Sequence, residues 1–129
     1  MIERRREELK LVEAQYGELE RGPNCDWFIV RRFSLVAGWN KSQTRVLVQI
    51  PPGYPATPPD NFYTDPDLLI LDGTGPGNTS VANVLEQQWL MFSFHFVEAA
   101  DWQPHSEAIK GHNFLTFLQG VASRLLEVS

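Results

Sequence analysis

Ser93 and His95 are the residues whose types and spacing best suit catalysis, because a hydroxyl and an imidazole are separated by a single residue. A neutral imidazole can act as a nucleophile or a general base near neutral pH. If the aromatic run 89–97 is a strand, its alternation points Ser93 and His95 to the same side, which is compatible with a Ser-His pair. Glu98 and Asp101 are the acids that could orient the imidazole. The alternative is a core histidine whose ring is held by backbone carbonyls among aromatic side chains.

The three histidines, His95, His105 and His112, also form a potential ligand set for a metal ion. Catalytic metal sites often use three protein side chains and leave one position open. The spacing places no two of these histidines on one helix face, so we expect no metal and no other cofactor. The only cysteine, Cys25, excludes an internal disulfide and a cysteine-based zinc cluster, and we interpret it as a small structural residue.

A rigid bend precedes these residues in the sequence. Five prolines lie within residues 51–59, here called the proline segment, between an alternating apolar run and the aromatic pair Phe62-Tyr63. Each proline fixes φ, removes a backbone donor and favours extended backbone in the residue before it, which excludes a helix. The chain must therefore leave one strand, cross a stiff turn and enter the next. Tyr54-Pro55 and Pro58-Pro59 are candidates for cis bonds.

The elements around the proline segment indicate an α+β fold. A helix is expected from residue 1 to about residue 20, ended by Gly22-Pro23. A second helix is expected over the broad apolar stripe from Phe114 to Leu126, with Asn113 as its N-cap. Between them, short connections predict an antiparallel meander of four strands, with the helices on one face of the sheet. The expected strands are residues 27–35, 44–50, 62–63 and 68–71, and the aromatic run 89–97 follows a glycine-rich loop at 72–83.

Composition limits the function classes. A chain of 129 residues with 43% hydrophobic residues can bury one core, so we expect a single domain over residues 1–129. The net charge is −5, and no lysine or arginine occurs between Arg45 and Lys110, which argues against nucleic-acid binding through this half. No apolar run is long enough to span a membrane, and no apolar signal region follows the charged N-terminus. We therefore expect a soluble, cytoplasmic protein.

The order of these motifs resembles the ubiquitin-conjugating enzyme superfamily. Its members carry an N-terminal helix, a strand meander and a Tyr-Pro and Pro-Pro signature before a short aromatic strand, which Tyr54-Pro55, Pro58-Pro59 and Phe62 match. The superfamily also places a Trp-x-Pro motif ahead of a core helix, as Trp102-Gln103-Pro104 does here. The resemblance covers residues 1–129 and is greatest to the minimal bacterial branch, which occurs alongside ubiquitin-like modifiers and their activating enzymes.

The chain departs from the superfamily at the nucleophile. In the superfamily, a cysteine between the proline signature and Trp-x-Pro carries the modifier's C-terminal carboxyl as a thioester. The interval 60–101 contains no cysteine here, and the His-Pro-Asn tripeptide of the superfamily is also absent. Cys25 precedes the meander and is a poor substitute by position. Counting back from Trp102, His95 lies nearest to the expected position of the nucleophile.

The resemblance therefore implies a ubiquitin-conjugating-like protein that works in a bacterial modification pathway. We expect it to bind the modifier or the activating enzyme without cysteine thioester chemistry, as a pseudoenzyme. By analogy, the first helix meets the activating enzyme. The residues expected to contact a partner are Arg4, Arg5, Arg6, Tyr54, Pro55 and Trp89.

Two other functions are compatible with the sequence. One is a small enzyme that uses His95, either with Ser93 or with His105 and His112 as metal ligands. The other is an adaptor that pairs an edge of its sheet with another strand.

Overall fold

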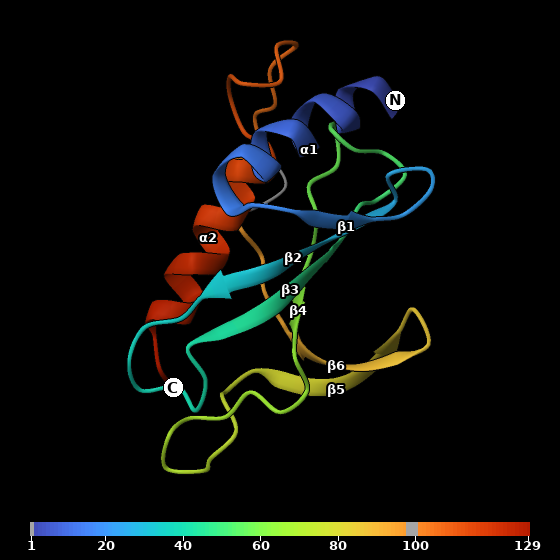
Figure 1. Cartoon of the computed structure of the whole chain (residues 1–129). Helices are drawn as coiled ribbons and strands as arrows, with labels where there is room; N and C mark the ends of the chain where they lie inside the picture. Colours follow the sequence, from blue (N-terminus) through green and yellow to red (C-terminus); the bar gives the residue numbers. More distant parts are fainter. Residues whose placement is uncertain (1, 98–100) are drawn as a thin grey trace.

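The computed structural model describes residues 2–97 and 101–129. Helix α1, Ile2–Tyr16, and helix α2, Phe114–Leu126, both pack on one face of an antiparallel sheet (Figure 1). This arrangement confirms the predicted α+β class with an N-terminal and a C-terminal helix. No helix among the described residues has the length and apolar character needed to cross a membrane.

The sheet has six strands, so the prediction of a four-stranded meander is wrong. Strands β1 to β4 are neighbours in sequence order, and a hairpin of β5 and β6 joins the sheet through β6, which pairs with β4. All neighbouring strands are antiparallel. The strands are β1 Leu19–Arg21, β2 Trp27–Ser34, β3 Gln43–Gln49, β4 Phe62–Thr64, β5 Thr79–Val84 and β6 Gln87–Phe92.

Two strands lie where other structure was predicted. The first helix was expected to continue over β1, but it ends at Tyr16, because Gly17 takes a φ of +88°, which glycine tolerates best. Most of β5 falls in the expected glycine-rich loop. It pairs with β6 across a two-residue turn, Leu85 and Glu86, in which both residues have positive φ.

Two predicted strands also have different limits. Residues 68–71 form no strand. The Leu68 and Ile70 N–H groups bond within turns, and the contact of this segment with residues 38–40 is limited to single hydrogen bonds and an isolated bridge between Ile70 and Trp39. The aromatic run 89–97 is a strand in its first part. Strand β6 ends at Phe92, so the alternation that would align Ser93 with His95 does not continue past this point.

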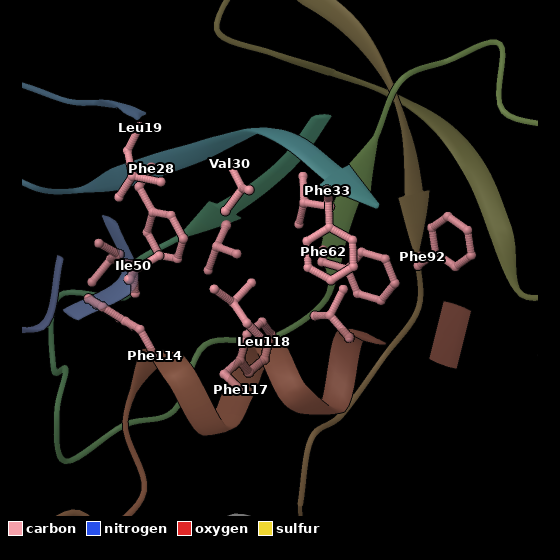
Figure 2. Packing of buried hydrophobic residues seen from close by; sticks show 14 of the residues in the cluster. Leu19, Phe28, Val30, Phe33, Ile50, Phe62, Phe92, Phe114, Phe117 and Leu118 are labelled. Atoms are coloured by element: carbon pink, nitrogen blue, oxygen red, sulfur yellow. The ribbon is translucent and has the colours of Figure 1, made fainter. Parts of the chain in front are cut away.

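The main core lies between the sheet and the helices (Figure 2). Phe28 of β2 packs against Phe114 of α2 with ring centroids 5.1 Å apart, and Phe62 of β4 stacks on Phe92 of β6 at 4.6 Å. All four rings are buried. Each such ring stabilises the fold by about 1.5–3 kcal/mol through the apolar area that it removes from water.

Helix α2 begins as predicted. The Asn113 side chain accepts a hydrogen bond from the Thr116 N–H at 3.0 Å, and the Thr116 hydroxyl accepts one from the Asn113 N–H at 2.8 Å. This reciprocal pair is a capping box, which satisfies two backbone donors at the start of the helix.

The opposite face of the sheet carries a smaller apolar cluster around Trp89. The Trp89 ring is fully buried, its Nε1–H donates to the Val84 carbonyl at 2.9 Å, and the Arg45 guanidinium lies 4.2 Å from the ring centroid. The prediction that Trp89 contacts a partner is therefore wrong, because neighbouring strands and Arg45 already cover it.

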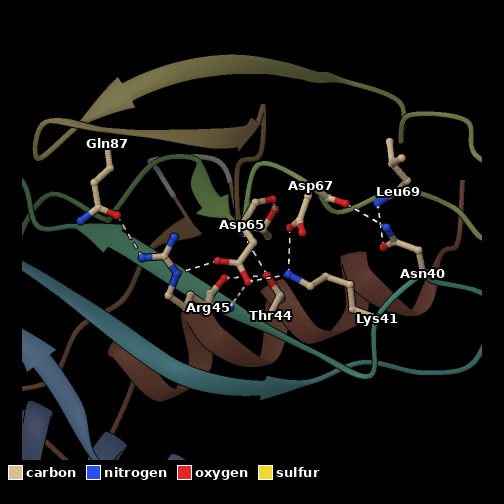
Figure 3. A network of polar contacts seen from close by, with 9 residues as sticks. Asn40, Lys41, Thr44, Arg45, Asp65, Asp67, Leu69 and Gln87 are labelled. Carbon is tan, nitrogen blue, oxygen red and sulfur yellow. Dashed lines mark hydrogen bonds and ion pairs between the residues drawn. The ribbon is translucent and has the colours of Figure 1, made fainter.

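A polar network ties the segment after β4 to β3 (Figure 3). The Asp65 carboxylate accepts hydrogen bonds from Arg45 Nε at 2.6 Å and from Lys41 Nζ at 3.0 Å, and Arg45 also donates to Gln87 at 3.1 Å. Burial opposes ionisation of Asp65. The hydrogen bonds from Arg45 and Lys41 outweigh it and keep the pKa of Asp65 below its usual value.

Candidate functional site

The first half of the proline segment is attached to a buried carboxylate of α1. Glu8 is only 1% exposed, and its Oε1 accepts hydrogen bonds from the Tyr54 hydroxyl at 2.5 Å and from the Phe114 N–H at 2.7 Å. Its Oε2 accepts from Arg4 Nε at 2.7 Å. Burial and the adjacent Glu8 charge raise the pKa of Tyr54 far above its usual value. One carboxylate therefore joins α1, the proline segment and the first turn of α2.

Two of the three arginines that precede Glu8, Arg4 and Arg5, also point inward. The Arg4 guanidinium donates to the His105 carbonyl, and the Arg5 guanidinium donates to the carbonyls of Cys25 at 3.2 Å and Pro51 at 3.1 Å. Arg4, Arg5 and Tyr54 are all buried and bonded within the fold, so their predicted role in partner contact is corrected to a mainly structural one, and only small parts of Arg4 and Tyr54 reach the surface.

Two of the predicted partner residues keep accessible surface. Arg6 is exposed and Pro55 is half-buried. The inward face of α1 could have been identified from the sequence. Arg4 and Glu8 are four residues apart, on the same side of the helix as the apolar Leu9 and Val12.

An exposed pair of side chains, Asp60 and His95, lies directly after the proline segment. Asp60 Oδ1 lies 2.7 Å from His95 Nδ1, and the two side chains are 58% and 73% exposed. The alternative of a core histidine is therefore wrong. When the imidazole is neutral and carries its proton on Nδ1, an acid at Nδ1 orients the ring and leaves the Nε2 lone pair free, which is the arrangement that a nucleophile or general base requires.

The backbone around this pair is fixed on both sides. The Asn61 N–H donates to the Phe94 carbonyl at 2.8 Å, and the Phe94 N–H donates to Asn61 Oδ1 at 2.9 Å. The ring of Phe96 packs on α2 at Gly120, where an added Cβ would lie 2.5 Å from it. His95 is thus presented outward between two anchored phenylalanines.

Among the described residues, the acid that meets His95 is Asp60, which sequence reasoning did not choose. Glu98 lies outside the described residues, and Asp101 is exposed. Asp60 was missed because it belongs to a different part of the chain, which reaches His95 only through the pairing of β4 with β6. Ser93 is exposed and its N–H donates to the Asn78 carbonyl at 2.8 Å. In the described residues, no hydrogen bond links Ser93 to His95.

The other two histidines have separate local roles. His105 Nδ1 accepts from the Glu107 N–H at 2.9 Å, and His112 Nδ1 accepts from the Gln103 N–H at 2.8 Å. Within residues 2–97 and 101–129, no three side chains of the kinds that ligate metals lie close enough to share an ion. The three-histidine metal site considered from the sequence is therefore not formed.

The two motifs that carried the resemblance contact each other. Trp102 is buried, and its Nε1–H donates to the Pro55 carbonyl at 2.7 Å. The Trp102 ring stacks on His112 with centroids 5.2 Å apart, just before α2 begins. Cys25 lies elsewhere, buried in the turn between β1 and β2, where its N–H donates to the Gly22 carbonyl at 3.0 Å.

A hollow surface runs along the outer side of α1. One part, of about 760 Å³, lies between α1, the proline segment and residues 104–106, and a second part, of about 600 Å³, lies between α1 and residues 106–110. Both parts are lined by Glu7 and Ser106, so they adjoin, and we call them together the α1 groove. Ile109 at its margin is 71% exposed. The remaining lining residues are Glu3, Arg4, Lys10, Leu11, Pro52, Gly53, Tyr54, Pro55, Ala56, Pro104, His105, Glu107, Ala108 and Lys110.

Comparison with known proteins defines the class as bacterial ubiquitin-conjugating-like proteins. The family model described as Prokaryotic E2 family E matches residues 1–125, and the chain belongs to that family. The match spans α1, the proline segment, the Asp60 and His95 pair and most of α2. No curated protein and no solved structure matches the chain.

Proposed function

We propose that this protein acts in a cytoplasmic bacterial ubiquitin-like modification pathway and binds the modifier or its activating enzyme without cysteine thioester chemistry. Membership of the prokaryotic family supports the pathway. The position of Cys25 is the observation that argues most directly against thioester chemistry. Cys25 is the only thiol of the chain and is buried in the turn between β1 and β2. A thioester requires an accessible thiolate, which Cys25 does not supply.

The α1 groove is the surface that we assign to the activating enzyme. It combines apolar groups, of which Ile109 is the most exposed, with the charged side chains of Glu7 and Lys10. An apolar centre with a polar rim is the usual composition of a specific protein interface. Pro55 gives one wall of the groove a fixed backbone, while Arg6 is exposed on α1 outside the groove.

Titration of the purified activating enzyme against this protein tests the assignment. Ile109→Asp replaces an exposed apolar side chain of the groove with a charge and should weaken binding by about tenfold or more, equivalent to about 1.4 kcal/mol. Leu71→Asp is the matched control, because Leu71 is also 71% exposed but does not line the groove. Equal affinities for wild type and Ile109→Asp would exclude this surface.

A second candidate function is acyl transfer through His95, and the close contact of 2.7 Å between His95 Nδ1 and Asp60 Oδ1 favours it. The Nε2 lone pair would attack the activated C-terminal carbonyl of the modifier and form an N–C bond. The bond from the carbonyl carbon to the leaving group would break, with the leaving group keeping the electron pair. Asp60 would stabilise the positive charge on the ring until a target amine takes the acyl group.

Intact mass measurement after mixing with modifier and charged activating enzyme tests this second candidate. A covalent adduct is expected with wild type, loss of the adduct with His95→Ala, and a lower yield with Asp60→Asn. Gln88→Ala changes another exposed side chain, which does not line the α1 groove, and serves as the control. Ser93→Ala tests whether the neighbouring hydroxyl takes part. If wild type forms no adduct, acyl transfer is excluded and only the binding function remains.

A further inference from the structure

The two edges of the sheet differ in length and in chemistry. One edge is β1, which has three residues, and the other is β5, which has six. In the described part of the chain, no strand pairs with the outer side of β5. The backbone groups on that side of β5 are therefore the longest unpaired row in the sheet.

The register of the hairpin identifies these groups. Along an antiparallel pair of strands, every second residue bonds to the partner strand. The bond from the Ser93 N–H to the Asn78 carbonyl shows which residues of this hairpin do so. Every second residue from Asn78 thus bonds toward β6. The intervening residues, Thr79, Val81 and Asn83, direct their N–H and carbonyl groups outward.

The β5 edge lacks the usual protection against pairing. Proteins commonly shield a sheet edge with charged side chains, proline, a bulge or a very short strand. Edge strand β1 is short and carries Glu20 and Arg21, and Arg21 pairs with Glu13 at 2.7 Å. Strand β5 has the sequence Thr-Ser-Val-Ala-Asn-Val, with no charge and no proline, and Val81 at its centre is 65% exposed.

We infer that β5 is the interface of a homodimer, in which it pairs antiparallel with β5 of a second copy. The strand is complementary to itself about Val81. A two-fold axis there places Val81 opposite Val81 of the second copy and Thr79 opposite Asn83 of the second copy. The exposed valines then cover each other, the polar Thr79 and Asn83 face each other, and no charge on either strand opposes the contact.

The size of the contact sets the strength of this dimer. A pair of six-residue strands is smaller than a standard protein interface. The dimer is therefore reversible, and the dimeric fraction rises with protein concentration. The continuous sheet that results leaves the α1 groove free, because none of the groove residues lies on β5.

Sedimentation of the full chain over a wide concentration range tests the dimer. The mass of wild type should rise from 14.7 kDa toward twice that value. Val81→Lys sets like charges opposite each other and should raise the dissociation constant about tenfold or more. Ser80→Lys is the matched control, because it adds the same charge on the other face of the strand, and it should change the constant less than about threefold. A 14.7 kDa species at every concentration, or equal weakening by both variants, would refute the inference.

Cross-linking tests the register independently. Residues opposite each other in a hydrogen-bonded antiparallel pair have Cα atoms about 5.5 Å apart, within the range of a disulfide. Under mild oxidation, Val81→Cys should therefore give a disulfide-linked dimer, whereas Ser80→Cys should give little, because it faces Ala82 of the second copy. Equal cross-linking of the two variants, or none with Val81→Cys, would overturn the proposed axis.

Discussion

The two ends of the proline segment differ in burial although they belong to one rigid stretch. At its first half, Tyr54 is buried and bonded to Glu8, a carboxylate that is 1% exposed. At its far end, Asp60 is 58% exposed and bonded to His95, which is 73% exposed. Both ends use a carboxylate to organise another side chain. The buried end connects three elements of the fold, and the exposed end leaves a reactive atom accessible to a partner.

Three carboxylates of the chain form a series that tests this comparison. Their side-chain exposures are 1% for Glu8, 16% for Asp65 and 58% for Asp60. Because solvent screens a charge pair more effectively as exposure grows, the loss of stability on removing the carboxylate should fall in the same order.

Glu8→Ala should have the largest effect. It removes the acceptor for Tyr54 and Phe114 and leaves Arg4 buried without its counter-charge, at a cost of about 3–5 kcal/mol. Urea denaturation measures this loss. A loss below about 1 kcal/mol would mean that Glu8 does not connect the elements as described.

Tyr54→Phe should have the next largest effect. The ring keeps its stacking on Phe114, with centroids 4.3 Å apart, but the hydrogen bond to the charged Glu8 is lost, at a cost of about 1.5–3 kcal/mol. Tyr63→Phe is the matched control, because its hydroxyl bonds to the neutral Gln49 at 3.0 Å and should cost only about 0.5–1.5 kcal/mol. If Tyr63→Phe is less stable than Tyr54→Phe, the hydrogen bond between Tyr54 and Glu8 does not connect the elements of the fold as described.

Asp65→Asn should lower stability by about 1 kcal/mol at neutral pH, because the pairs with Arg45 and Lys41 are partly screened by solvent. The folded state keeps the pKa of Asp65 below its usual value of 3.8. The stabilisation by the carboxylate is therefore complete above that pH and is lost as the pH falls below it toward the folded-state pKa. Denaturation of wild type and variant between pH 7 and pH 2 should show two curves that converge at low pH. Parallel curves would contradict this account of Asp65.

Asp60→Asn and His95→Ala should have the smallest effects on stability, within about 0.5 kcal/mol of wild type, because their ion pair is exposed. Thermal unfolding measures the difference. If either variant destabilises the protein as much as Tyr54→Phe does, the exposed end has a structural role, and the comparison between the two ends fails.

Much of the fold could be predicted from periodicity. The apolar stripe of α2 and its Asn113 cap, and the alternation of residues 44–50, follow directly from the spacing of apolar residues. Strand β1 was missed because three residues are too few to show a period. Strand β5 was missed because its small polar residues resemble a loop, and its turn, Leu85-Glu86, lacks the glycine or asparagine that usually marks a hairpin.

The site was harder to predict than the fold. His95 could be chosen from its position relative to Trp102, but Asp60 meets it only because β4 and β6 are neighbours, which the sequence does not reveal. Arg4 and Arg5 were assigned to a partner by analogy with the first helix of the superfamily. Their burial depends on Glu8 and on backbone carbonyls that other elements bring to them.

The most direct test of the central claim uses the single thiol. Wild type and Cys25→Ala are each mixed with modifier and charged activating enzyme, and any adduct that a thiol reagent cleaves is measured by intact mass. The account predicts that Cys25→Ala changes neither the yield of such an adduct nor the affinity for the activating enzyme. A thiol-cleavable adduct that forms on wild type and is absent from Cys25→Ala would contradict it.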